Sequence, residues 1–112
     1  MRQGAVYRNG ELVGQIIEHP RNGYSFIYDK AWFDDSSKPA ISLTLPKTSR
    51  EHRSKFLFPF FFNMLSEGVN RRLQSTQLRI DEQDSFGLLL ATAQYDTIGA
   101  ITVKHIPADE KN

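Results

Sequence analysis

The chain has 112 residues, of which 39% are hydrophobic and 24% charged, and a formal net charge of +1. This length allows one domain with one core and excludes a two-lobed enzyme with a cleft between lobes. The near-neutral charge argues against a dedicated nucleic-acid-binding protein, and the absence of cysteine excludes disulfides and thiolate metal sites. No stretch reaches the roughly 20 apolar residues of a membrane span and no signal-peptide pattern is present, so we expect a cytoplasmic protein.

The N-terminal part has the pattern of three antiparallel strands. Residues 5–8 and 11–18 flank Asn9-Gly10, and this pair is a strong hairpin signal because both residues tolerate the positive φ of a two-residue turn. A second turn at residues 19–23 leads to Tyr24–Tyr28, where aromatic and smaller residues alternate. We therefore expect a sheet that starts with a hairpin and a third strand.

The next part is more polar and contains a further expected strand. Residues 29–39 predict a loop or a single helical turn around Trp32, which is either an aromatic lid over the sheet or an anchor at an interface. Residues 40–46 alternate apolar and hydroxyl side chains, which predicts a strand that ends at Pro46. The basic residues of 47–55 indicate either a solvated loop or a patch that faces an acidic partner or phosphates.

Residues 55–68 contain five of the eight phenylalanines. Pro59 predicts the start of a helix and Gly68 its end, since proline suits the first turn and glycine the left-handed closing residue. Its buried stripe would consist of Leu57, Phe60, Phe61, Met64 and Leu65. Phe62 projects away from that stripe, so either a strand or loop covers it or it belongs to a docking surface.

Two further helices and a last strand are expected in the C-terminal part. Residues 69–75 form a short helix with Val69 and Leu73 on one face and with its arginines pointing outward. A third helix is capped by Asp84 or Ser85 and has the apolar stripe Phe86, Leu89, Leu90 and Ala93. Tyr95–Thr97 is a turn, Ile98–Ile106 a final strand, and residues 107–112 a flexible tail.

Together these patterns predict a single α+β domain over residues 1–112, in which a small, partly barrel-like antiparallel sheet of about five strands packs with two to three short helices. The three histidines lack the spacing of metal ligands, and no phosphate-binding loop or nucleophile elbow occurs. We expect no catalytic residues, no metal and no cofactor. The residues alone indicate a soluble protein-interaction module.

Four segments, in the same order, give the chain a resemblance to a known family. They are residues 6–14, 41–46, 60–68 with 71–73 behind them, and 96–103. This order resembles the N-terminal subdomain of HipA-type toxin kinases, the region that precedes the kinase core. The chain departs from the family pattern at Ser66, where proline is frequent, and at Phe62, where a polar residue is frequent.

As a short chain without a kinase core, the protein is similar to HipS-type proteins of three-component HipBST toxin–antitoxin systems. The resemblance implies an antitoxin that binds and inhibits a HipT-like Ser/Thr kinase, in a ternary complex with a DNA-binding HipB-like protein, and that does not itself bind nucleic acid. The alternative is a non-inhibitory accessory subunit that assists assembly with the HipB-like protein and operon autoregulation. A domain cut from a longer HipA-like kinase would have the same sequence features.

The candidate partner-binding residues lie mainly at the end of the phenylalanine-rich helix. They are Trp32, Phe62, Asn63, Ser66, Glu67, Gly68, Val69, Asn70, Arg71 and Arg72. A protein inhibitor needs about 800 Å² of interface per partner, centred on aromatic anchors, and Phe62 lies beside a tight protruding corner. We expect this corner to enter or border the substrate or nucleotide cleft of the kinase, with Arg71 and Arg72 meeting acidic groups of the kinase.

Overall fold

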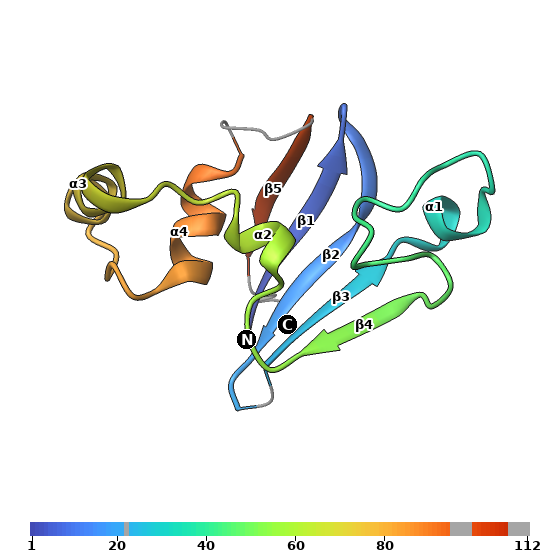
Figure 1. Cartoon of the computed structure of the whole chain (residues 1–112), viewed down its shortest axis with the longest axis horizontal. Helices are drawn as coiled ribbons and strands as arrows, with labels where there is room; N and C mark the ends of the chain where they lie inside the picture. The colour runs from blue at the N-terminus through green and yellow to red at the C-terminus, as the bar shows by residue number, and fades with distance from the viewer. Residues whose placement is uncertain (22, 95–99, 108–112) are drawn as a thin grey trace.

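The computed structural model describes residues 1–21, 23–94 and 100–107, and shows one antiparallel sheet with strand order β4-β3-β2-β1-β5 (Figure 1). The strands are β1 Arg2–Arg8, β2 Glu11–His19, β3 Gly23–Tyr28, β4 Glu51–Ser54 and β5 Ile101–Ile106. The helices are α1 Lys30–Asp34, α2 Pro59–Phe62, α3 Gly68–Leu78 and α4 Ser85–Thr92. Among the described residues, no helix has the length and apolar character needed to cross a membrane.

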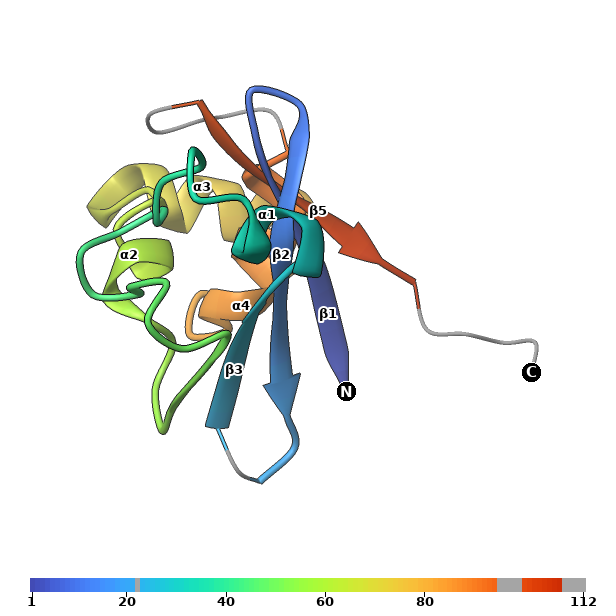
Figure 2. The same ribbon diagram turned by 90° about the vertical axis from the view of Figure 1, so that its right-hand side faces the viewer.

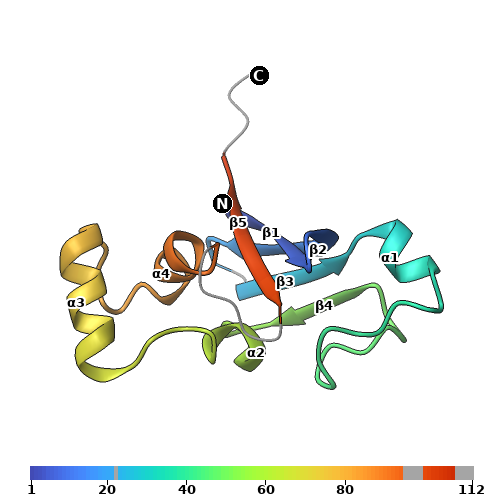
Figure 3. The ribbon, with the colours of Figure 1, turned by 90° about the horizontal axis from the view of Figure 1, so that it is seen from above.

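The helices and the sheet form two layers. Figures 2 and 3 show α2, α3 and α4 on one side of the sheet, whereas no helix in the described part of the chain covers the other face of its central strands. The core lies between the layers and includes Val6, Ile16, Phe26, Phe61, Leu89 and Val103. The α+β class and five-stranded antiparallel sheet are confirmed, but the sheet is open rather than partly barrel-like, because β4 and β5 end it without pairing to each other.

The hairpin turn and the third strand follow from the sequence as expected. Asn9 and Gly10 have φ values of 50° and 83°, the left-handed conformation that this two-residue turn requires. The short polar segment after β3 is the single helical turn α1, whose start is capped by the Asp29 carboxylate accepting from the Ala31 backbone amide. The expected turn at Tyr95–Thr97, residues 98 and 99 of the last strand, and the tail from residue 108 lie outside the described residues.

The expected strand at residues 40–46 is wrong, and this segment is a looped connection. A strand would place Ile41, Leu43 and Leu45 on the same face. Instead Ile41 and Leu45 pack against the core while Leu43 is 99% exposed. The fourth strand is β4, within the segment expected to be a basic loop, and it pairs with β3 in the register Phe26↔His52.

The phenylalanine-rich helix starts at Pro59 as predicted but is much shorter than expected. It ends at Phe62, and residues 63–67 continue as turns in which the amides of Met64 and Leu65 donate to carbonyls three residues earlier. Gly68 has the expected positive φ of 59°, yet it begins α3 instead of closing the preceding helix. The predicted stripe does face inward: Phe61 and Leu65 are buried, and the other three residues pack against the core.

An ion-pair cluster fastens α4 to the first two strands. The Arg2 guanidinium donates to both carboxylate oxygens of Asp84 at 2.9 Å and to both of Glu18 at 2.7 and 2.9 Å, and these contacts raise the pKa of Arg2. Asp84 also caps α4, accepting from the Gly87 amide at 3.0 Å. Any side chain at position 87 would start 2.3 Å from the Asp84 carboxylate, so glycine is what allows this arrangement.

Asp84 should make the stability of the domain depend on acid pH. The hydrogen bond from Arg2 holds the pKa of Asp84 below its usual value, so its contribution is present above the unfolded pKa of about 3.9 and is lost as pH falls through the native pKa. We expect Asp84→Ala to lower the free energy of unfolding at pH 7 by about 2 kcal/mol, from the lost cap and ion pair. Asp84→Asn keeps the cap and should cost less.

Urea unfolding at pH 7 and pH 3 measures this effect. The difference between wild type and Asp84→Asn should shrink at pH 3, because this pH is below the unfolded pKa of about 3.9 and the unfolded wild-type chain then gains stability by binding the proton. An unchanged difference between the two pH values would show that the charge of Asp84 does not stabilise the native state.

Candidate partner-binding site

The residues between the end of α2 and the first turns of α3, residues 62–72, form a corner around a surface hollow. This α2–α3 corner stands where the chain leaves α2 and turns into α3 (Figure 1). The hollow has a volume of about 400 Å³ and is lined by Phe62, Leu65, Ser66, Glu67, Gly68, Arg71, Glu82, Gln83 and Ser85. The structure therefore brings five of the ten sequence-predicted residues together around one concave site.

Phe62 separates this hollow from a second one. Its side chain is 47% exposed, so of the two alternatives for Phe62 the covered one is wrong. The second hollow, of about 360 Å³, lies on the side of β3 and the chain before α2, and it shares Phe62, Gln83 and Ser85 with the first. A half-exposed aromatic ring between two concave surfaces is well placed to enter a partner, since large aromatic side chains dominate binding energy.

Arg71 has a different role from the one expected. Its Nε donates to the Glu82 carbonyl at 3.0 Å, its Nη2 donates to Ser85 Oγ at 2.8 Å, and the guanidinium lies 5.8 Å from the centre of the Phe62 ring. The expectation that both arginines point outward is therefore wrong for Arg71, which ties α3 to the start of α4 and supports Phe62. Arg72 is exposed on the next position of α3.

The apolar face of α3 is exposed instead of packed. Val69 is 63% exposed and Leu73 55% exposed, and no residue of α3 is buried. Arg71 explains this orientation. The helix turns the side that carries Arg71 toward α4, so its two apolar residues, Val69 and Leu73, face solvent. Asn63, Glu67, Gly68 and Asn70 are exposed as well, and Ser66 is half-buried. An apolar strip with polar flanks is typical of a surface that a partner covers.

Trp32 lies apart from the corner, in α1 at the end of β3. It is buried, and its indole Nε1 donates to the Pro39 carbonyl at 2.9 Å while the Lys38 ammonium lies 5.3 Å from its ring centre. This environment favours the lid alternative over the interface anchor. Trp32 has little surface with which to contact a partner, and the candidate surface is the corner without it.

Sequence reasoning missed the opposite wall of the hollow. Glu82 and Gln83 come from the connection between α3 and α4, and Ser85 is the first residue of α4. Phe56, which is exposed, lines the second hollow. The only sequence signal at that wall is the helix cap at Asp84 and Ser85, which predicts an element boundary but not its contact with Arg71. Together with Glu67 and Arg71, these residues and Phe62 provide aromatic surface and charged groups of both signs.

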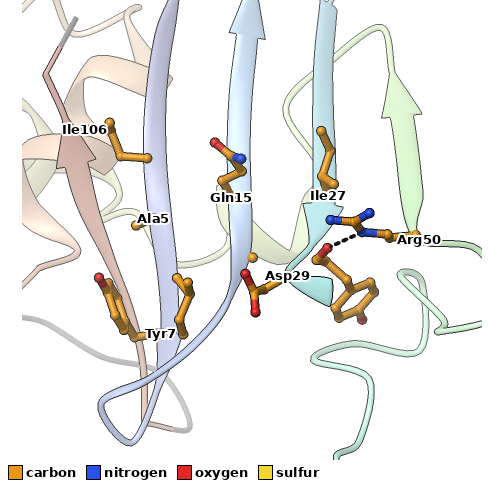
Figure 4. A pocket seen from close by; sticks show the side chains of 10 residues that line it. Ala5, Tyr7, Gln15, Ile27, Asp29, Arg50 and Ile106 are labelled. Carbon is orange, nitrogen blue, oxygen red and sulfur yellow. Dashed lines mark hydrogen bonds between the residues drawn. The ribbon is translucent and has the colours of Figure 1, made fainter. Parts of the chain in front are cut away.

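A further hollow of about 350 Å³ lies on the uncovered face of the sheet. Figure 4 shows its lining from β1, β2 and β3, including Ala5, Tyr7, Gln15 and Ile27, with Arg50 beside them. Arg50 Nε donates to the Tyr28 carbonyl at 2.8 Å and so closes one end of this hollow. None of the sequence-predicted site residues lies in this hollow. The uncovered sheet face therefore serves as a control surface for the α2–α3 corner.

Comparison with known proteins places this architecture in a family. The sequence profile of the HipA N-terminal domain matches residues 4–104. A solved structure described as the N-terminal domain of HipA toxin superposes with a TM-score of 0.73 and 29% identity, covering 96% of this chain and 95% of that one.

Two curated relatives differ greatly in length. The chain is 31% identical over 104 residues to an "Uncharacterized protein" of Haemophilus influenzae, covering 93% of this chain and 92% of the relative. It is 28% identical over 106 residues to "Putative kinase Y4mE" of Sinorhizobium fredii, covering 95% of this chain but only 24% of that protein. The part of the longer relative that is matched is thus about a quarter of its length. By its sequence and by its fold, the chain belongs to the HipA N-terminal domain family.

Proposed function

We propose that the chain is an antitoxin-type binding protein that associates with a HipT/HipA-like Ser/Thr kinase toxin and inhibits it. The α2–α3 corner docks at or near the kinase active site. Family membership supports the kind of partner, since the domain occurs in a kinase-named relative of about four times its length and in a relative of nearly its own length. The partner in this proposal is a kinase that lacks this domain.

The observation that carries the proposal is the exposure of Phe62 at the rim of the corner hollow. Phe62 is 47% exposed, so a partner that buries its ring gains the transfer free energy of that apolar surface. The Arg71 guanidinium packs near the Phe62 ring and restrains it, so the ring loses little conformational entropy when a partner binds. Val69 and Leu73 extend the apolar surface along α3.

The ternary complex with a DNA-binding HipB-like protein is a further part of the proposal. The chain itself is not expected to bind DNA. Two of its basic side chains are engaged within the domain: the Lys47 ammonium donates to the carbonyls of Asp35 and Lys38 at 2.8 and 2.7 Å, and Arg50 donates to the Tyr28 carbonyl. With a formal net charge of +1, the chain also lacks the basic excess that binding to phosphates normally needs.

The test is a phosphorylation assay with a purified HipT-like kinase that lacks this domain. Adding the chain in excess of the dissociation constant should abolish phosphoryl transfer to substrate. Tight binding with unchanged kinase activity would contradict inhibition and support the alternative of a non-inhibitory accessory subunit. No binding at all would refute the proposed partner.

A further inference from the structure

Residues 42–44 form a tight turn that presents a leucine to solvent. Leu43 is 99% exposed. The Leu45 amide donates to the Ser42 carbonyl at 3.0 Å, the Thr44 amide donates to Ser42 Oγ at 3.2 Å, and the two hydroxyls of Ser42 and Thr44 are 2.9 Å apart. The turn is therefore closed by its own polar groups, and Leu43 contributes nothing to the packing of the domain.

The two residues on either side of the turn hold it on the core. The Tyr28 hydroxyl is buried, donates to the Leu45 carbonyl and accepts from the Ile41 amide at 3.1 Å. Leu45 is buried and Ile41 packs against the same core. A side chain displayed on a backbone fixed in this way loses little conformational freedom when a partner covers it.

The turn and α2 lie on the same side of the sheet, with the connection that contains the turn toward the opposite end of the long axis from α3 (Figure 3). Figures 2 and 3 show the connection from α1 to β4, which contains the turn, on the side of the sheet where α2 lies. Leu45 and Phe61 are members of one core cluster, while Leu43 and Phe62 lie outside it. Residues 43–73 contain five exposed apolar side chains, which are Leu43, Phe56, Phe62, Val69 and Leu73.

We propose that the Leu43 turn is a second anchor for the kinase that binds the corner. A single exposed leucine is common on protein surfaces, but an interface of about 800 Å² per partner extends beyond one hollow, and the turn offers an apolar side chain on the same side of the sheet as α2. In the Sinorhizobium fredii relative the matched domain is 24% of the chain, so the rest of that protein is available to cover this side. The inference rests on the proposed function and names a separate contact for the same partner.

The experiment measures the affinity of Leu43→Asp for the kinase by calorimetry. We expect a loss of about tenfold or more, as for an interface anchor, with an unchanged melting temperature because Leu43 packs against nothing. The matched control is Leu12→Asp, since Leu12 is 40% exposed and lines the hollow on the opposite sheet face. The control should bind within twofold of wild type.

The possible results separate this inference from the proposed function. Unchanged affinity of Leu43→Asp, with a loss for Phe62→Asp, would overturn the second anchor and leave the corner in place. An equal loss for Leu43→Asp and Leu12→Asp would also overturn it, because the effect would then be independent of the face. Absence of binding by the wild-type chain would refute the proposed function itself. A photo-crosslinking amino acid at position 43 should form an adduct with the kinase in the wild-type background, and no adduct would contradict direct contact.

Discussion

Replacing Phe61 by alanine is expected to lower the free energy of unfolding by about 3–5 kcal/mol, the range for truncating a buried aromatic residue. Phe61 is fully buried, and its ring centre lies 5.8 Å from that of Phe26 in the sheet and 5.2 Å from that of Phe60. It is the contact through which α2 joins the core. For a domain of this size, such a loss is a large part of the total stability.

Phe62→Ala is the matched control, since it removes the same side chain one position later. Phe62 is half-exposed, so we expect a change of less than about 1 kcal/mol. Urea unfolding of the two variants measures the contrast. Equal destabilisation by both changes would contradict the division of α2 into a buried and a partner-facing side.

The double variant Phe62→Asp with Glu67→Arg should weaken binding to the kinase by at least about 30-fold, the effect of losing one interface hot spot. The aspartate removes the aromatic anchor and places a charge at the centre of the interface, where desolvation is costly. The arginine reverses the charge at the start of α3. Both residues line the same hollow, so the two changes act on one surface.

Calorimetric titration of the kinase with this variant gives the measurement. The matched control is Leu12→Asp with Glu11→Arg, which makes the same chemical changes near the start of β2; Leu12 lines the hollow on the far sheet face. Glu11 forms an ion pair with Lys38 at 2.8 Å, an exposed contact whose loss costs little. Unchanged affinity of the corner variant would identify the corner as the wrong surface.

The sequence predicts elements well where a local rule determines them. Asn9-Gly10 sets the hairpin and Asp84 caps α4, because each acts through its own backbone neighbours. Residues 40–46 alternate like a strand, yet the Tyr28 hydroxyl bonds to Ile41 and Leu45 and holds a loop instead. That bond joins residues 13 and 17 positions apart, and no pattern within the segment contains it.

The same distinction applies to β4 and to the site. The sequence Glu51–Ser54 is charged and does not alternate, and it becomes a strand through pairing with β3. Phe62 could be predicted as outward from helical periodicity, because that argument needs only the spacing in α2. The inward direction of Arg71 depends on Glu82 and Ser85, 11 and 14 residues away, so the wall of the hollow could not be predicted.

Hydrogen exchange of the chain, alone and bound to the kinase, shows which surface the kinase covers, because it reports on backbone amides along the whole chain. We expect binding to slow exchange at residues 62–72 and in the turn at 42–44, most of which are exposed in the free chain. The uncovered sheet face around Tyr7 and Gln15 should exchange as in the free chain. Protection confined to that sheet face, with none at the corner, would show that the α2–α3 corner is not the kinase-binding surface.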